Sequence, residues 1–284
     1  MEIIVAESAG FCFGVKRAVE TVYSEIESGG KIYTFGPIIH NAHVVSDLEE
    51  KGVTVIDDIE KIKHLDSGTI IIRSHGVSKE TYAILEESNL KVVDATCPFV
   101  KKIHRIVERD SALGKHIVVT GSRNHPEVMG IIGWCSPDNP ATVLETQEEA
   151  YDYAPGDDRD ITVVSQTTFT QGKFKELVEI LRKKGYNIHI VNTICDATAR
   201  RQEEAQKIAS AVDMMIVIGD SKSSNTQKLY EICSRECKNT MYVQTKDNLE
   251  TGSSRSLQRV GITAGASTPS KIIEEVQKYV RTYF

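Results

Sequence analysis

Three of the six cysteines share a regular spacing with three glycines. Each of these cysteines precedes its glycine by 24 residues, and successive cysteines lie 85 and 98 residues apart: Cys12, Cys97 and Cys195, with Gly36, Gly121 and Gly219. Thiolates bind metals, and a helix N-terminus favours the thiolate form. Three converging thiolates could hold zinc together with a histidine. They could also hold a four-iron cluster that keeps one iron open to substrate.

The remaining cysteines lack such a pattern. Cys233 and Cys237 are four residues apart in a stretch of helical periodicity that includes Leu229, and Cys135 lies beside Trp134. No further ligand types accompany them at a metal-site spacing. Free cysteine is among the most often buried residue types, so we expect these three to pack in the interior.

Polar side chains gather in the segments that follow short apolar stretches. Imidazole, hydroxyl and amide groups donate hydrogen bonds to phosphate oxygens, and helix N-termini assist them. Glu127, two residues after His125, is the carboxylate among them and the candidate proton donor. Plain alternatives are a surface acid for Glu127 and helix caps for the serines. The polar residues are His40, His75, His125, Thr167, Ser223, Ser224, Asn225 and Ser267.

The elements that must position these residues alternate between strand and helix. Apolar stretches stopped by glycine predict strands over 32–36, 117–121 and 215–219, and partner strands are predicted over 69–72, 161–164 and 260–263. Apolar residues at helical spacing follow each of the three spaced cysteines, which therefore lie where a strand turns into a helix. Alternating strands and helices predict parallel sheets, whose ligands gather at the carboxyl ends of the strands.

This threefold recurrence predicts an α/β protein built from three related modules. The expected bounds are 13–97, 98–195 and 196–284. Segment 1–12 is expected to complete the third module, because a comparable strand precedes the other two cysteines. We expect the modules, each with a small parallel sheet, to pack in a pseudo-threefold arrangement that brings the three cysteines together.

Composition and the lack of certain motifs argue against several classes of function. The 284 residues carry a formal net charge of −6, with 40% hydrophobic and 26% charged residues, which is ordinary for a globular protein. No apolar stretch approaches the roughly 18 residues of a membrane helix, and the acidic start lacks the basic region of a secretory signal. We therefore expect a cytoplasmic protein that binds neither nucleic acid nor membrane. Walker and dinucleotide fingerprints are absent from the sequence, which does not support an NTP or NAD site.

A series of short motifs runs in order along nearly the whole chain. They occupy 10–15, 40–41, 74–77, 94–98, 125–128, 166–168, 193–198, 223–225 and 263–267. In residues and spacing the series resembles the 4-hydroxy-3-methylbut-2-enyl diphosphate reductase family, which catalyses the last step of the non-mevalonate isoprenoid route. Several of the motifs would be weak evidence alone, but the ordered set is highly specific.

The resemblance implies a cofactor, a reaction and a role for each motif. It implies a central [4Fe–4S] iron-sulfur cluster held by Cys12, Cys97 and Cys195. The reaction would be the reductive dehydroxylation of an allylic diphosphate to isopentenyl and dimethylallyl diphosphate, by an oxidoreductase fed by a ferredoxin- or flavodoxin-type electron donor. Glu127 would supply protons, and Thr167 would orient the substrate hydroxyl. The diphosphate would be bound by His40, His75, His125, Ser223, Ser224, Asn225 and Ser267.

Two other interpretations of the same residues stay open. A cluster-dependent hydro-lyase would use an open iron without net electron transfer, and it would turn over without a reductant. A zinc-stabilised module that binds a phosphorylated metabolite would be colourless and inactive in redox assays.

Overall fold

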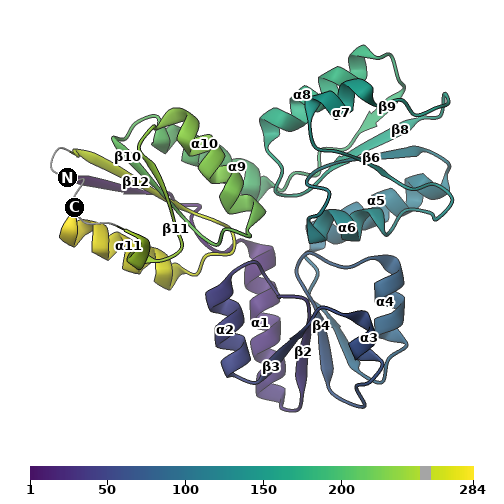
Figure 1. Ribbon diagram of the computed structural model, residues 1–284, viewed down its shortest axis with the longest axis horizontal. Helices are drawn as coiled ribbons and strands as arrows, with labels where there is room; N and C mark the ends of the chain where they lie inside the picture. The colour runs from purple at the N-terminus through teal and green to yellow at the C-terminus, as the bar shows by residue number, and fades with distance from the viewer. Residues whose placement is uncertain (250–256) are drawn as a thin grey trace. The chain divides into compact units, whose positions relative to one another are not determined.

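A computed structural model describes residues 1–249 and 257–284, and Figure 1 shows their three sheets. Each sheet has four parallel strands, and the order of the strands is equivalent in all three sheets. A short edge strand comes first and is followed by the strand that ends at a spaced glycine. The partner strand is third, and the strand that precedes a spaced cysteine is last. The orders are β3-β2-β4-β5, β7-β6-β8-β9 and β11-β10-β12-β1. The predicted α/β class with three small parallel sheets is confirmed.

The strands are short and belong to the three sheets as follows. The first sheet contains β2 (Ile32–Phe35), β3 (Val53–Ile56), β4 (Thr69–Ile72) and β5 (Lys91–Asp94). The second contains β6 (His116–Thr120), β7 (Thr142–Leu144), β8 (Ile161–Ser165) and β9 (Ile188–Ile190). The third contains β1 (Glu2–Val5), β10 (Met214–Ile218), β11 (Thr240–Val243) and β12 (Arg259–Ala264).

Helices connect the parallel strands, and three of them begin directly after the spaced cysteines. These are α1 (Phe13–Ser28), α5 (Pro98–Ala112) and α9 (Asp196–Ala209), so the predicted strand-to-helix position of each cysteine is confirmed. Pro98 suits the first turn because it lacks the N–H that a helix start leaves unpaired. The other helices are α2 (Ala42–Glu50), α3 (Ile59–Ile62), α4 (Lys79–Glu86), α6 (Pro126–Ile132), α7 (Gln147–Asp152), α8 (Gln171–Lys183), α10 (Ser224–Glu236), η1 (Lys246–Asn248) and α11 (Ser270–Tyr283).

The central strands are buried on both faces, which explains why they read as continuous apolar runs. In the second sheet, Val118 and Val163 belong to one hydrophobic cluster, whereas Val119 and Val164 belong to another. Successive residues of a strand point to opposite faces, so the two clusters pack on the two sides of this sheet. Among the described residues, no helix is both long enough and apolar enough to cross a bilayer.

The described residues group into two compact units. Unit 1 comprises Met1–Lys16, His40–Ser46 and Cys195–Phe284, and unit 2 comprises Arg17–Ile39 and Asp47–Ile194. Unit 1 thus contains the third sheet, in which β1 pairs with β12, and unit 2 contains the first and second sheets. The segment His40–Ser46 belongs to unit 1, although its neighbours along the chain belong to unit 2. The three-module bounds and the pseudo-threefold arrangement stay predictions.

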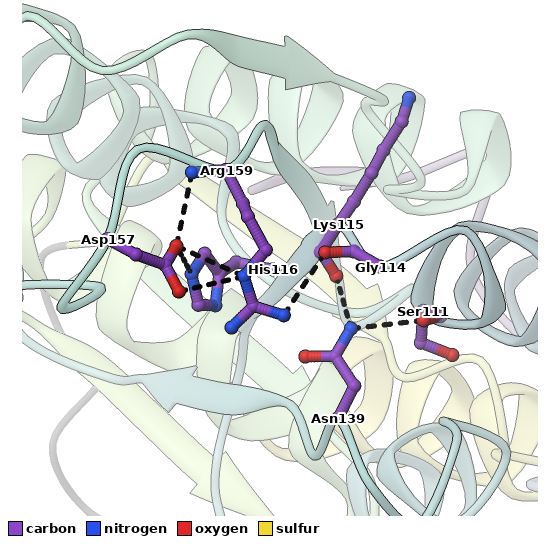
Figure 2. A network of polar contacts seen from close by, with 7 residues as sticks. All are labelled: Ser111, Gly114, Lys115, His116, Asn139, Asp157 and Arg159. Atoms are coloured by element: carbon purple, nitrogen blue, oxygen red, sulfur yellow. Dashed lines mark hydrogen bonds and ion pairs between the residues drawn. The ribbon is translucent and has the colours of Figure 1, made fainter.

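Two polar loops of unit 2 form a hydrogen bond and an ion pair with residues at the start of β6 (Figure 2). The Asn139 side chain donates a hydrogen bond to the carbonyl of Lys115 at 2.7 Å. Asp157 pairs with His116 (Nε2 to Oδ1, 2.7 Å) and with Arg159 (Nε to Oδ2, 2.8 Å). His116 therefore has a structural contact, which agrees with its place outside the sequence motifs.

Candidate active site

The candidate proton donor Glu127 is buried beside Thr167 in unit 2. Its side chain is 2% exposed, and both of its carboxylate oxygens accept hydrogen bonds from Thr167. The Thr167 N–H reaches Oε1 at 2.6 Å, and the hydroxyl reaches Oε2 at 2.7 Å. Burial raises the pKa of Glu127 to about 7, against the lowering effect of the two Thr167 hydrogen bonds. A carboxyl group with a pKa near 7 can give and take a proton near neutral pH.

Local structure explains how Glu127 reaches this position. His125 caps α6, because its ring Nδ1 accepts the Glu127 N–H at 3.1 Å. A Cβ atom at Gly121, after β6, would lie 2.8 Å from the Gln166 side chain and 2.9 Å from Val128. Glycine at this strand end therefore lets the start of α6 and the loop after β8 approach each other, which brings Glu127 and Thr167 into contact.

A tight turn after β4 carries His75 and contacts the backbone of Cys97. The Cys97 N–H donates to the Ser74 carbonyl at 3.0 Å. Gly76 has φ +72°, and a Cβ there would lie 2.8 Å from His104, so this turn requires glycine. The His75 ring meets the His125 ring edge to face, with 5.4 Å between centroids. Unit 2 thus brings two of the predicted diphosphate ligands together.

Two ring side chains, Trp134 and His104, contact the same turn. Trp134 donates its indole N–H to the Val77 carbonyl at 2.8 Å. The His104 ring stacks on Trp134, with 5.1 Å between centroids. Burial lowers the pKa of His104 to about 4, so this histidine is neutral near pH 7 and serves as a packing residue.

Unit 1 brings Cys12 and Cys195 into electrostatic range of each other. Cys195 is the N-cap residue of α9, and the Cys12 N–H donates to the Ala266 carbonyl at 3.2 Å. Burial raises the pKa of Cys195, and the nearby Cys12 adds to that effect. Backbone N–H groups at the start of α9 act in the opposite direction, as expected at a helix N-terminus.

Arg201 is a buried cation close to both of these thiols, and sequence reasoning missed it. Its side chain is 3% exposed and donates to the carbonyls of Ser8 (Nε, 2.8 Å) and Gly10 (Nη2, 2.7 Å). Burial lowers its pKa, whereas Cys12 and Cys195 raise it. Within the described part of the chain, its Nη1 has no hydrogen-bond partner. A positive charge so placed stabilises thiolates.

The serine loop, residues 221–224 at the start of α10, also lies in unit 1. Ser223 caps this helix, and the Ser267 hydroxyl lies 3.4 Å from the Ser223 hydroxyl. Ser267 donates to the His40 carbonyl at 2.9 Å. Asn225 is 4% exposed, and neither polar atom of its amide has a hydrogen-bond partner among the residues that the structure describes. Such a buried amide is unfavourable unless a ligand completes its hydrogen bonds.

The sequence-predicted site residues therefore form two groups. Unit 1 holds Cys12, Cys195, His40, Ser223, Ser224, Asn225 and Ser267, and unit 2 holds Cys97, His75, His125, Glu127 and Thr167. That the two groups serve one substrate stays a prediction. Two of the other cysteines pack in the interior as expected: Cys233 is fully buried, and Cys237, which follows the last residue of α10, is in the same core cluster. Cys135 is half-buried and packs against the cluster around Val119.

Comparison with known proteins identifies the family. A family profile described as "LytB protein" matches residues 3–281, almost the whole chain. The chain belongs to the LytB family. A LytB relative from Thermoanaerobacter sp. (strain X514) is named 4-hydroxy-3-methylbut-2-enyl diphosphate reductase and is 47% identical over 283 residues, covering 99% of this chain and 97% of the relative. A relative of the same name from Clostridioides difficile (strain 630) is 43% identical, covering 99% of each chain.

Solved structures agree with the LytB assignment. The E-1-hydroxy-2-methyl-but-2-enyl-4-diphosphate reductase from Plasmodium falciparum superposes with a TM-score of 0.91 at 30% identity, covering 99% of this chain and 87% of that chain. A second structure, described as (E)-4-hydroxy-3-methyl-but-2-enyl diphosphate reductase, the terminal enzyme of the non-mevalonate pathway, has a TM-score of 0.69 at 41% identity and covers 99% of both chains. The family resemblance inferred from the motifs is confirmed.

Proposed function

We propose that this protein reductively dehydroxylates (E)-4-hydroxy-3-methylbut-2-enyl diphosphate to isopentenyl and dimethylallyl diphosphate. The observation that carries the proposal is the match to relatives named for this reductase over almost their entire length. The buried pair of Glu127 and Thr167 adds chemical support, because the reaction must protonate an oxygen that leaves carbon.

The cysteine set fits the cofactor that the family resemblance implies. We propose that Cys12, Cys97 and Cys195 hold a [4Fe–4S] cluster. Each of these thiols stands at the start of a helix, where the helix dipole favours negative charge. Buried Arg201 interacts electrostatically with two of these thiols, Cys12 and Cys195, and adds a positive charge that suits an anionic cluster. When bound, such a cluster supplies electrons and an iron open to the substrate oxygen.

Glu127 and Thr167 would together deliver the proton that turns the departing hydroxyl into water. Near pH 7 a large fraction of Glu127 is protonated, because its pKa is raised to about 7. The acid can then donate to the Thr167 hydroxyl oxygen, 2.7 Å away, and the Thr167 hydroxyl can donate its own proton to the substrate oxygen. The carbon–oxygen bond breaks and the oxygen leaves as water. Two electrons from the external donor reduce the allylic group, and a second proton forms the new C–H bond of the product.

The diphosphate would anchor the substrate through imidazole, hydroxyl and amide groups. We propose that it is bound by His40, His75, His125, Ser223, Ser224, Asn225 and Ser267. The buried Asn225 amide, which has no hydrogen-bond partner among the described residues, would gain partners in this way. Binding energy from this remote group can hold the reacting carbon in place, which lowers the barrier of the chemical step.

Electrons would arrive one at a time from a ferredoxin- or flavodoxin-type donor. Such donors occur in the cytoplasm, where we predict that the enzyme acts. A separate donor is needed because the reaction consumes two electrons and the sequence carries no nicotinamide fingerprint.

Anaerobic purification followed by metal analysis tests the cofactor and the reaction class together. We expect a brown protein with about four iron and four sulfide per chain, as the proposed cluster requires, and turnover only with a reductant. A colourless protein that contains zinc would contradict the proposal and favour a binding module. An iron-containing protein that turns over without any reductant would favour a hydro-lyase.

A further inference from the structure

The Asp220 carboxylate joins two segments of unit 1 that lie far apart in the sequence. Its Oδ1 accepts the Lys222 N–H at 2.8 Å, and its Oδ2 accepts the Ala42 N–H at 3.0 Å. Ala42 is the first residue of α2 and lies two residues after His40. Asp220 is only 9% exposed, so these hydrogen bonds are largely shielded from water. Asp220 therefore ties the His40 segment to the loop that leads into α10.

The same residue is held firmly in place. Its backbone carbonyl accepts the Tyr242 hydroxyl at 2.6 Å and the Ser223 N–H at 2.9 Å. A second hydrogen bond holds the His40 segment, because the Ser267 hydroxyl donates to the His40 carbonyl. The His40 segment thus has two ties to the third sheet's loops. These ties account for the grouping of His40–Ser46 with unit 1 rather than with its neighbours along the chain.

We propose that Asp220 is a positioning residue that holds His40 beside the Ser223 loop, so that both are preformed for the diphosphate. The proposal rests on the proposed function, because it takes His40 and the serine loop as diphosphate ligands. Positioning groups before the ligand arrives removes an ordering cost from binding, and an Asp that is itself locked by hydrogen bonds can do this.

The direction in which diphosphate affinity changes when Asp220 is replaced distinguishes positioning from charge repulsion. A carboxylate near a bound diphosphate repels it, so charge alone predicts tighter binding when Asp220 is replaced by a neutral residue. Positioning predicts weaker binding, since loss of the hydrogen bond to Ala42 removes one of the two ties that hold the His40 segment. Binding of a probe anion can therefore decide between them.

The main experiment is titration calorimetry of inorganic diphosphate into the cluster-loaded protein under anaerobic conditions. We expect Asp220→Ala to weaken binding about tenfold, in the range of one buried hydrogen-bonding group. The diphosphate affinity of Asp220→Asn should lie between those of the wild type and Asp220→Ala, because the amide oxygen can replace one of the two carboxylate acceptors. Because part of the Asp220 effect passes through His40, the double variant with Asp220→Ala and His40→Ala should lose less binding free energy than the sum of the two single losses. Tighter or unchanged binding in Asp220→Ala, or additive losses in the double variant, would overturn the proposal.

Asp213→Ala is a matched control. Asp213 also accepts two backbone N–H groups, from Gln258 at 2.9 Å and Arg259 at 2.8 Å, but it precedes β10 whereas Asp220 follows it. Its replacement should leave diphosphate affinity unchanged. An equal loss in this variant would assign the effect to general loosening of unit 1 and contradict a specific role for Asp220.

Hydrogen–deuterium exchange tests the tie without relying on the proposed function. In Asp220→Ala we expect faster exchange at the Ala42 amide and across residues 42–46, with β10 unchanged. Unchanged exchange at Ala42 would remove the structural basis of the inference. A wild-type protein that binds no diphosphate, but shows the expected exchange change, would contradict the proposed function and the positioning role while leaving the tie intact.

Discussion

Glu127 and Thr167 are joined twice, through the backbone N–H and the side-chain hydroxyl of the threonine. With Glu127 ionised, both hydrogens point at the carboxylate, at 2.6 and 2.7 Å. Protonation of Glu127 reverses the hydroxyl bond, because the acid then becomes the donor. The Thr167 hydroxyl proton is thereby released toward another acceptor. This pair can store a proton in a buried place and pass it on without moving the backbone.

Replacing Glu127 by Gln keeps the size and the hydrogen-bonding capacity of the side chain but removes its acidic proton. We expect kcat to fall by about 10²- to 10⁴-fold, the usual contribution of a general acid, while substrate still binds. Steady-state kinetics with a chemical electron donor and calorimetric binding of the substrate give both quantities. Turnover equal to that of the wild type would eliminate the acid role.

Glu127 also makes stability depend on pH in a defined window. Its pKa is about 7 in the folded protein against 4.5 for an ordinary glutamate, so the folded state holds a proton that the unfolded chain releases. The stabilisation is complete below pH 4.5 and is lost as pH rises to about 7, an effect of about 3 kcal/mol. Glu127→Gln lacks this dependence.

Urea unfolding at pH 4.5 and pH 8 measures the effect by comparing the two proteins. The free energy of unfolding of the wild type, taken relative to Glu127→Gln, should decrease by about 3 kcal/mol between the two pH values. Other groups titrate equally in both proteins and cancel in this difference. A difference that stays constant with pH is incompatible with a buried, protonated Glu127.

His125 caps α6 and is proposed to bind the diphosphate, and two substitutions distinguish these two roles. His125→Ala removes both the α6 cap and the proposed diphosphate contact, so we expect lower stability by about 1 kcal/mol and weaker diphosphate binding. His125→Asn restores an N-cap acceptor for the Glu127 N–H and should recover most of the stability, but not the affinity. Thermal unfolding and calorimetric titration with inorganic diphosphate report the two effects. Unaltered diphosphate affinity in both variants would rule out the contact.

Each of the three spaced cysteines should be required for the cofactor. Cys12→Ser, Cys97→Ser and Cys195→Ser should each lose bound iron and all activity, because serine is a poor substitute for a thiolate ligand. Cys233→Ser, in a buried core position, is the control and should retain iron nearly as well as the wild type. Iron and sulfide analysis after anaerobic reconstitution measures the result. If Cys233→Ser alone removed the cluster, the ligand assignment would be wrong.

The sequence predicts those parts of the fold that have strong local signals. The central strands around Val118 and Ile216 are continuous apolar runs, and Cys97 and Cys195 fall at helix starts as expected. The edge strands β3, β7 and β11 went unpredicted. They have three or four residues and are only partly buried, so their composition resembles that of loops.

Two buried charged residues show different limits of sequence reasoning. Arg201 lies on the stripe of α9 that otherwise buries Thr198, Ala205 and Ala209, so a charge at an interior position was a usable signal. Asp220 offered no comparable signal for its long-range contact. Its turn with Lys222 is local, but its partner Ala42 is 178 residues away along the chain, and only the folded structure connects them.

The most direct test of the proposed reaction is an anaerobic assay of the reconstituted protein with the hydroxylated allylic diphosphate and a chemical one-electron donor. Product analysis should find isopentenyl and dimethylallyl diphosphate, with two electrons consumed for each product molecule and no turnover when the donor is omitted. Failure to form either product by a protein that carries its full complement of iron and sulfide would contradict the account.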